Sequence, residues 1–310
     1  MWHSLAVEQQ EDPWVAAMRA GDFDGAWHIS DAILQQRVRN GEQCWHRPRH
    51  LQFVWRGGEL SNRRVLVRCY HGLGDTLQFI RFGKPLRAIA REVIVWVQPA
   101  LLPLVASAPG VDFALPLTDG TPDVAYDVDI EIMELAHALR VSRDDVGAYV
   151  PYLAPPQTRR IAELARDKPN VGLVWQAGDW DTRRSVPDEF IRMLSKTVGV
   201  NFVSLQRGAS AARSAQLGLR DLSSDDVTRT ADVIAQLDLT ISVDTMVAHL
   251  AGALGCPVWT LLQAHADWRW MEDRDDSPWY PTMRLFRQSQ PGEWLPVVHA
   301  VRRALAERFG

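Results

Sequence analysis

The chain has 310 residues, of which 46% are hydrophobic and 23% are charged, and its formal net charge is −4. This composition is typical of a soluble globular protein with one large or two medium domains, and it gives no basic field for nucleic acid. Cys44, Cys69 and Cys256 lie far apart, which argues against a disulfide framework and a CxxC zinc site. The first residues lack the apolar core of a signal peptide, and no stretch of about 18 apolar residues exists. We therefore expect a cytoplasmic protein without a membrane span.

Residues 12–40 predict a helical hairpin. Apolar residues recur at helical spacing around Trp14 and Met18 and again around Trp27, and the short AGDFDGA segment separates the two runs. The hairpin looks like one tetratricopeptide-type unit. One such unit cannot bury its own apolar face, so we expect it to dock on the body of the protein, with a protein partner as the alternative.

Residues 63–139 alternate between strand and helix patterns. The expected strands are 63–70, 92–98, 113–117 and the first part of 126–139, and the expected helices are 75–90, 100–108 and the second part of 126–139. This order predicts a parallel sheet with crossover helices.

The segment Val150–Arg160 contains three prolines and is expected to be a linker, after which the alternation restarts. The expected strands are 170–176, 201–206, 237–243 and 257–262; helices should start near Pro187, Ser210, Thr230 and Thr245, and a last helix should span 294–309. The prediction is therefore an α/β protein with two Rossmann-like domains facing across a cleft. The expected division is 1–55 (helical), 56–155, 156–290 and 291–310 (C-terminal helix).

The first candidate site is HGLGDTLQF, where the first strand becomes a helix. Gly72 and Gly74 permit a tight turn and a close approach of the backbone. The third glycine of a dinucleotide fingerprint would fall at Leu77, which argues against NAD. Asp75 suits a helix N-cap, and its place at a strand end facing a cleft also suits a general base.

A second acid-bearing junction occurs in the other half, at SVDTMVAHL. Backbone N–H groups of Thr245 and Met246, at the start of a helix, would form a diphosphate site. Asp244 is expected to be the N-cap, and His249 lies one turn after Thr245 on the same helical face. Two such junctions, one in each half, are a stronger signal than either alone.

Two further loops offer candidates with competing interpretations. Gly178 loosens the loop after the strand 170–176, and Arg183 and Arg184 follow it, either as phosphate ligands or as a solvated basic pair. Gln206 ends the next strand, where it could hold a ribose or a base, or lie at the surface.

The remaining acids do not predict a metal site. The acids between residues 272 and 276 lack the spacing of a Ca²⁺ loop, and Asp127 and Asp129 would share one face of a strand. Trp268, Trp270 and Trp279 are expected to pin a long loop by packing.

The motifs GLGDTLQF, VGLVW, SVDTMVAHLAGALGCPVW and DWRW followed by SPWYPTMRLFRQ together resemble glycosyltransferase family 9, the ADP-heptose:lipopolysaccharide heptosyltransferases and their relatives. The resemblance runs from about Val54 to the C-terminus. It is greatest to a branch often preceded by tetratricopeptide repeats, which agrees with the N-terminal hairpin.

The resemblance implies a GT-B fold and metal-independent inverting transfer of a sugar, with heptose as one candidate. The C-terminal half would bind a nucleotide-sugar donor, with ADP favoured over UDP or GDP, and no cofactor would be needed. The N-terminal half would bind the acceptor through Gly72, Gly74 and Gln78. Asp75 matches the proposed catalytic base. Donor-binding positions match Asp244, Thr245, Met246 and His249, with Arg183 or Arg184 near the phosphates, Gly178 in the same loop and Gln206 near the ribose.

Two alternatives remain at this stage. The repeat-like N-terminus favours a protein O-glycosyltransferase, in which the hairpin binds a protein acceptor. The other alternative is a non-catalytic partner protein that keeps the fold and uses its hairpin and tryptophan-rich surface for assembly. The first predicts binding of a nucleotide sugar, whereas the second predicts none.

Overall fold

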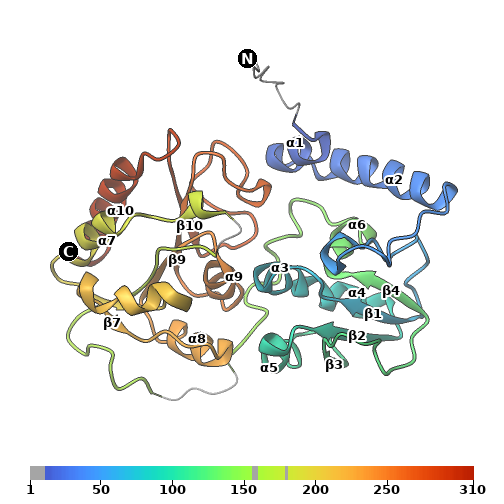
Figure 1. Cartoon of the computed structure of the whole chain (residues 1–310), viewed down its shortest axis with the longest axis horizontal. Helices are drawn as coiled ribbons and strands as arrows, with labels where there is room; N and C mark the ends of the chain where they lie inside the picture. Colours follow the sequence, from blue (N-terminus) through green and yellow to red (C-terminus); the bar gives the residue numbers. More distant parts are fainter. Residues whose placement is uncertain (1–10, 156–159, 179–180) are drawn as a thin grey trace, which may run out of the picture.

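The protein is an α/β structure with two separate parallel sheets, one in each half of the chain (Figure 1). The computed structural model describes residues 11–155, 160–178 and 181–310. The expected linker partly falls at residues 156–159, and the expected boundary between 155 and 156 borders them; that stretch lies outside the described residues. The predicted α/β class with parallel strands is confirmed, whereas the domain limits stay predictions.

The N-terminal sheet has four parallel strands in the order β3-β2-β1-β4. They are β1 (Arg64–Arg68), β2 (Glu92–Val97), β3 (Phe113–Pro116) and β4 (Val128–Glu131). Strands β1 and β2 have apolar centres and are almost completely buried, as expected for central strands covered on both faces. The carboxyl ends of β1 and β4 lie next to each other, since Arg68 pairs with Glu131 in the register.

The C-terminal sheet has six parallel strands in the order β10-β9-β8-β5-β6-β7. They are β5 (Asn170–Val174), β6 (Asn201–Ser204), β7 (Arg220–Asp221), β8 (Leu239–Val243), β9 (Val258–Leu262) and β10 (Met283–Arg287). Strands β7 and β10 were not among the predicted strands. In β10, Met283 and Leu285 are buried while Arg284 is exposed, an alternation that is short and lies beside a loop rich in acids and aromatic residues.

The helices agree with the predicted order but not with every predicted boundary. They are α3 (Leu73–Phe79), α4 (Gly83–Ile89), α5 (Leu102–Val105), α6 (Leu135–Ala138), α7 (Asp188–Ser195), α8 (Val227–Ile234), α9 (Met246–Ala253) and α10 (Trp294–Phe309). The prediction of a single helix over 75–90 was wrong, because the 3₁₀ turn η2 (Ile80–Phe82) separates α3 from α4. The helix predicted near Ser210 is instead a pair of 3₁₀ helices, η6 (Gly208–Arg213) and η7 (Ala215–Leu217).

The N-terminal hairpin consists of α1 (Pro13–Ala20) and α2 (Phe23–Arg39), which lie along one side of the N-terminal half (Figure 1). It contacts both halves of the protein. Trp27 Nε1 donates a 2.8 Å hydrogen bond to the Val141 carbonyl, and the Trp14 ring meets Trp268 edge-on at 5.1 Å. The apolar side chains around Trp14 and Trp27 are therefore in contact with the protein itself.

The two halves share one apolar core. A single cluster of buried side chains extends from Met18 in α1, through the N-terminal sheet, to Leu250 in α9 and Tyr280. Helices α3 and α9 meet at the centre of this contact (Figure 1). A second cluster fills the space between the C-terminal sheet and helices α7 and α10.

Arg81 lies at this junction with its side chain almost fully buried. Its guanidinium donates hydrogen bonds to the carbonyls of Gln78 (2.7 Å), Trp279 (2.6 Å) and Val146, and to the hydroxyl of Tyr152 (3.0 Å). The rings of Tyr152 and Tyr280 pack against it, at 4.8 and 4.6 Å from the guanidinium carbon. One cation therefore joins three segments of the chain, namely its own turn, residues 146–152 and residues 279–280.

Candidate functional site

The β1–α3 junction places Asp75 inside the first turn of α3, not before it. The N-cap is Gly72, so the prediction that Asp75 is the N-cap was wrong by three positions. The side chain still serves the helix start, because its Oδ2 accepts a 2.9 Å hydrogen bond from the Gly72 N–H. A carboxylate in the first turn also interacts favourably with the helix dipole.

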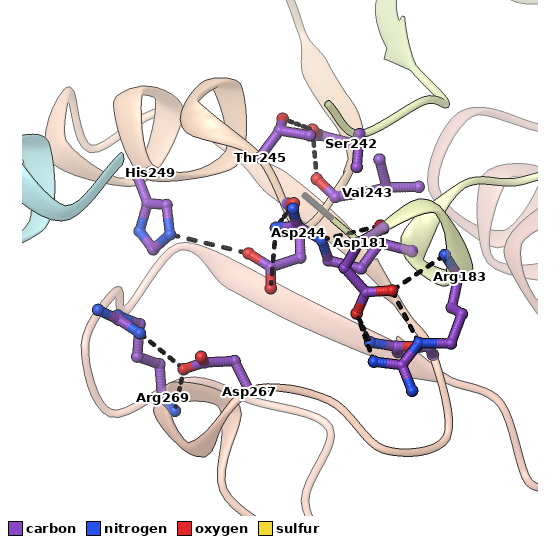
Figure 2. Close-up of polar contacts among 12 residues, drawn as sticks. Asp181, Arg183, Ser242, Val243, Asp244, Thr245, His249, Asp267 and Arg269 are labelled. Carbon is purple, nitrogen blue, oxygen red and sulfur yellow. Dashed lines mark hydrogen bonds and ion pairs between the residues drawn. The ribbon is translucent and has the colours of Figure 1, made fainter. Parts of the chain in front are cut away.

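Arg269 holds the other oxygen of Asp75. It belongs to the 3₁₀ helix η8 (Trp268–Trp270) of the C-terminal half, and its Nη2 donates to Asp75 Oδ1 at 2.6 Å. Its Nε donates to Gln78 Oε1 at 2.7 Å and its Nη1 to Asp267 Oδ1 at 2.8 Å (Figure 2 shows the Asp267 pair). Gln78 is therefore fully buried against an arginine rather than open to an acceptor.

Gly74 is the point of closest approach between α3 and α9. A Cβ atom at this position would lie 2.9 Å from His249 Cδ2 and 3.6 Å from Met246 Cα. Real Cβ contacts are almost never this short, so the glycine is required for packing. The sequence prediction of close backbone approach was right, although the approaching group is another helix of the same chain.

His249 is a buried residue of this helix contact. Its Nδ1 lies 2.9 Å from the Tyr280 hydroxyl, its ring stacks on Trp270, and its Nε2 points towards Asp244 Oδ1 at 3.8 Å (Figure 2). Burial lowers the pKa of His249 well below its ordinary value, and the positive charges of Arg269, Arg81 and Arg184 act in the same direction. A neutral, enclosed imidazole connects the two halves and is not available to bind phosphate directly.

The β8–α9 junction begins its helix at Met246. Thr245 is the N-cap, with its Oγ1 accepting from the Val247 N–H at 3.3 Å, so the prediction that Asp244 caps this helix was wrong. Asp244 precedes the cap and is buried, and burial raises the pKa of its carboxyl. Thr245 and Met246 remain partly exposed at the helix start, where a diphosphate site was expected.

Arg184 is the arginine that reaches this junction. Its Nη1 donates to the Asp244 carbonyl at 2.9 Å and lies 3.9 Å from Asp244 Oδ2. Arg183 points elsewhere, with three quarters of its side chain exposed and a bidentate pair to Asp181 at 2.8 and 3.0 Å (Figure 2). Gly178 is exposed in the same loop, with open space around its Cα. Of the two arginines that were predicted as alternatives, only Arg184 therefore contacts the start of α9.

Gln206 is fully engaged by the backbone around it. Its Oε1 accepts from the N–H groups of Trp175 (3.0 Å) and Gln176 (2.9 Å), and its Nε2 donates to the carbonyls of Gln176 (3.2 Å) and Arg207 (3.1 Å). The interpretation of Gln206 as a surface residue was wrong, because its side chain is buried. It joins the ends of β5 and β6.

A pocket of about 520 Å³ opens between the hairpin and the carboxyl ends of β1 and β4. Helices α1 and α2 line one side, and Trp268 and Trp279 come from the C-terminal half. The polar groups from the strand ends are His71, Glu131 and Glu134. The hairpin therefore borders a cavity beside the Asp75 junction.

The two glutamates of this pocket have strongly raised pKa values. Burial raises the pKa of Glu131 to about 8 and that of Glu134 to about 7. Backbone N–H groups limit the shift: Met133 donates to Glu131 at 2.8 Å, and Glu131 donates to Glu134 at 3.1 Å. Such groups titrate near neutral pH and are characteristic of functional sites.

Sequence reasoning missed His71, Glu131 and Arg269. The rule used for Asp75, an acid or base at the carboxyl end of a parallel strand, applies equally to His71 and to Glu131 and could have found them. Arg269 has no such local signal, since it lies in the DWRW segment, whose tryptophans suggested packing.

The described residues contain no group of three or more His, Cys, Asp or Glu side chains that could hold a metal ion. Asp127 and Asp129 instead pair with arginines: Asp127 with Arg91 at 3.2 Å and Asp129 with Arg68 at 2.7 Å. Within the same described residues, no helix is long and apolar enough to cross a membrane.

Comparison with solved structures identifies the architecture. A family 9 glycosyl transferase from Veillonella parvula matches with a TM-score of 0.54 and 12% identity, over 75% of this chain and 88% of that chain. The fold is that of the family 9 glycosyltransferases. E. coli ADP-heptose lipopolysaccharide heptosyltransferase II matches with a TM-score of 0.57 and 14% identity, over 80% of this chain and all of that chain. The E. coli heptosyltransferase WaaC with ADP-2-deoxy-2-fluoro heptose matches with a TM-score of 0.52 and 16% identity, over 79% and 99%.

Sequence comparison finds a relative that is a longer protein. The chain is 26% identical over 293 residues to protein FlbA of Caulobacter vibrioides, an alignment that covers 82% of this chain and 48% of FlbA. The chain thus spans about half the length of this curated relative. No protein-family model matches the sequence.

Proposed function

We propose that the protein is an inverting glycosyltransferase that moves a sugar from a nucleoside-diphosphate donor to an acceptor hydroxyl. The observation that carries the proposal is the presence of two strand-end junctions. In one half Arg184 lies beside the start of α9, and in the other half the β1–α3 junction, which carries Asp75, contributes His71 to the lining of a pocket of about 520 Å³. The fold shared with the family 9 structures supports the same activity.

In this proposal the donor diphosphate binds at the start of α9. The N–H groups of the first turn and the guanidinium of Arg184 would meet the charge that grows on the leaving nucleoside diphosphate. These groups would do so without a metal ion, and the acceptor would enter the pocket beside Asp75. An ADP-sugar is the favoured donor, because a solved structure with this fold holds ADP-2-deoxy-2-fluoro heptose.

The second candidate is transfer to a hydroxyl of a protein. It is favoured by one observation, the contribution of α1 and α2 to the wall of the pocket. A polypeptide bound along the hairpin would present its side chain to the same cavity. A glycan remains the first candidate for the acceptor.

The test is a thermal-shift panel with ADP, UDP, GDP, CMP and TDP at concentrations up to the millimolar range. A nucleotide present at 100 times its dissociation constant adds about 2.7 kcal/mol to the stability of the folded state, or several degrees in the melting temperature. We expect the largest shift with ADP. A folded sample that responds to none of the five would contradict the proposal and favour a non-catalytic partner protein.

A further inference from the structure

His71 is placed as a proton acceptor in the pocket. It lies three residues after the end of β1, lines the cavity, and has 30% of its side chain exposed. Its Nε2 lies 3.7 Å from Glu131 Oε2, and neither ring nitrogen makes a hydrogen bond with any described residue. A basic nitrogen lone pair is therefore available to a molecule in the pocket.

Both carboxylate oxygens of Asp75 already accept a hydrogen bond in this structure. Its Oδ1 is held by Arg269 at 2.6 Å and its Oδ2 by the Gly72 N–H at 2.9 Å. About a quarter of its side chain remains exposed. The carboxylate is thus fixed in position, with a partner on each oxygen.

Charged and titratable groups face His71 from four elements. Burial is the main cause that lowers the pKa of His71 below its ordinary value, and the negative charge of Asp75 in α3 opposes it. Arg269 from η8 and His50 from the 3₁₀ helix η1 (Arg49–Leu51) lower the pKa further, while Glu131 approaches from the end of β4. The imidazole is consequently neutral at pH 7, as a general base must be.

We propose that His71 removes the proton from the acceptor hydroxyl, and that Asp75, held by Arg269, is a positioning residue that stabilises the resulting imidazolium. This inference rests on the proposed glycosyl transfer. In the step, the acceptor oxygen forms its bond to the anomeric carbon as its proton passes to His71. The bond from that carbon to the diphosphate breaks, and its electron pair leaves with the nucleoside diphosphate. The imidazolium then loses its proton to water.

The experiment compares His71→Gln and Asp75→Asn with a matched control, His299→Gln, in the exposed face of α10. The probe is release of ADP from ADP-heptose with water as the acceptor, measured from pH 5 to 9, with the dissociation constant of ADP measured in parallel. His71→Gln should lower turnover by roughly a hundredfold or more, the usual scale for a general base, while ADP affinity stays unchanged. His299→Gln should behave as the wild type.

The pH profile separates the two candidate bases. With His71 as the base, turnover of the wild type decreases at acid pH. The midpoint of this decrease, the acid limb of the profile, lies below the usual pKa of a histidine. Asp75→Asn then lowers turnover but moves this limb to lower pH, because removing the negative charge weakens the imidazole as a base. If Asp75 were the base, Asp75→Asn would abolish the limb and His71→Gln would leave it in place, which would overturn the inference.

A second measurement does not depend on turnover. The ring Cε1–H signal of His71, assigned by its loss in His71→Gln, should titrate in the NMR spectrum below pH 6.5 and at still lower pH in Asp75→Asn. An unchanged midpoint in Asp75→Asn would contradict the role of Asp75. A wild type with neither ADP binding nor ADP release would instead remove the proposed function itself.

Discussion

Arg183 and Arg184 are neighbours in sequence but have different partners. Arg184 contacts the carbonyl of Asp244 at the start of α9, whereas Arg183 is exposed and paired with Asp181. The sequence predicted that one of them meets phosphate, and only the contacts distinguish them. Gln206 shows the same limit, since its hydrogen bonds go to backbone N–H groups just after β5, about 30 residues away in sequence.

We predict that Arg184→Gln weakens ADP binding by about tenfold or more, whereas Arg183→Gln changes it little. A hydrogen bond to a charged group contributes about 1.5–3 kcal/mol, and 1.4 kcal/mol corresponds to a factor of ten in affinity. Isothermal titration calorimetry of both variants with ADP measures this difference. Equal losses in the two variants would show that the phosphates do not lie beside Arg184.

At the scale of elements, the order of strands and helices followed from periodicity, but the helix ends did not. Helix α3 begins two residues before Asp75 because Gly72 supplies the extended N-cap backbone, and it stops at Phe79 where the η2 turn begins. No proline or glycine marks that stop, and it coincides with the buried Arg81. Tertiary contacts, which local sequence does not contain, set this boundary.

The α3–α9 contact gives a prediction about Gly74. In an isolated helix, Gly74→Ala should stabilise by up to about 1 kcal/mol. Here the added methyl group would lie 2.9 Å from the buried ring of His249, so we expect a net loss of about 1–3 kcal/mol in the free energy of unfolding. Urea denaturation measures it. Gly120→Ala is the matched control, because its nearest neighbour is 3.8 Å away. A Gly74→Ala protein as stable as the wild type would show that the helices are less closely packed.

At the scale of the whole molecule, the hairpin is part of the folded body. The sequence left open whether it docks on the protein or on a partner, since an amphipathic hairpin looks the same in both cases. Trp27 and Phe23 show that the hairpin packs on the protein, since both side chains are buried. Trp27 contacts Val141, and Phe23 contacts Trp279 of the C-terminal half. Neither contact has a signal in the local sequence.

We predict that Trp27→Ala lowers the free energy of unfolding by about 3–5 kcal/mol, the range for a buried aromatic residue. Hydrogen exchange should also increase in residues 131–141, which the hairpin covers. Trp45→Ala is the control, because more than half of its side chain is exposed. Thermal melting together with exchange mass spectrometry measures both effects. If the hairpin did not pack on the protein, Trp27→Ala and Trp45→Ala would show the same stability and the same hydrogen exchange.

The burial of Arg81 has a consequence for how the protein melts. Its guanidinium takes acceptors from both halves, and no carboxylate among the described residues forms an ion pair with it. If one half unfolded first, the other would retain a buried cation that had lost part of its hydrogen bonding, which is costly in a low-dielectric interior. The two sheets should therefore lose their structure together, and a scanning calorimeter should record one cooperative heat-absorption peak instead of two.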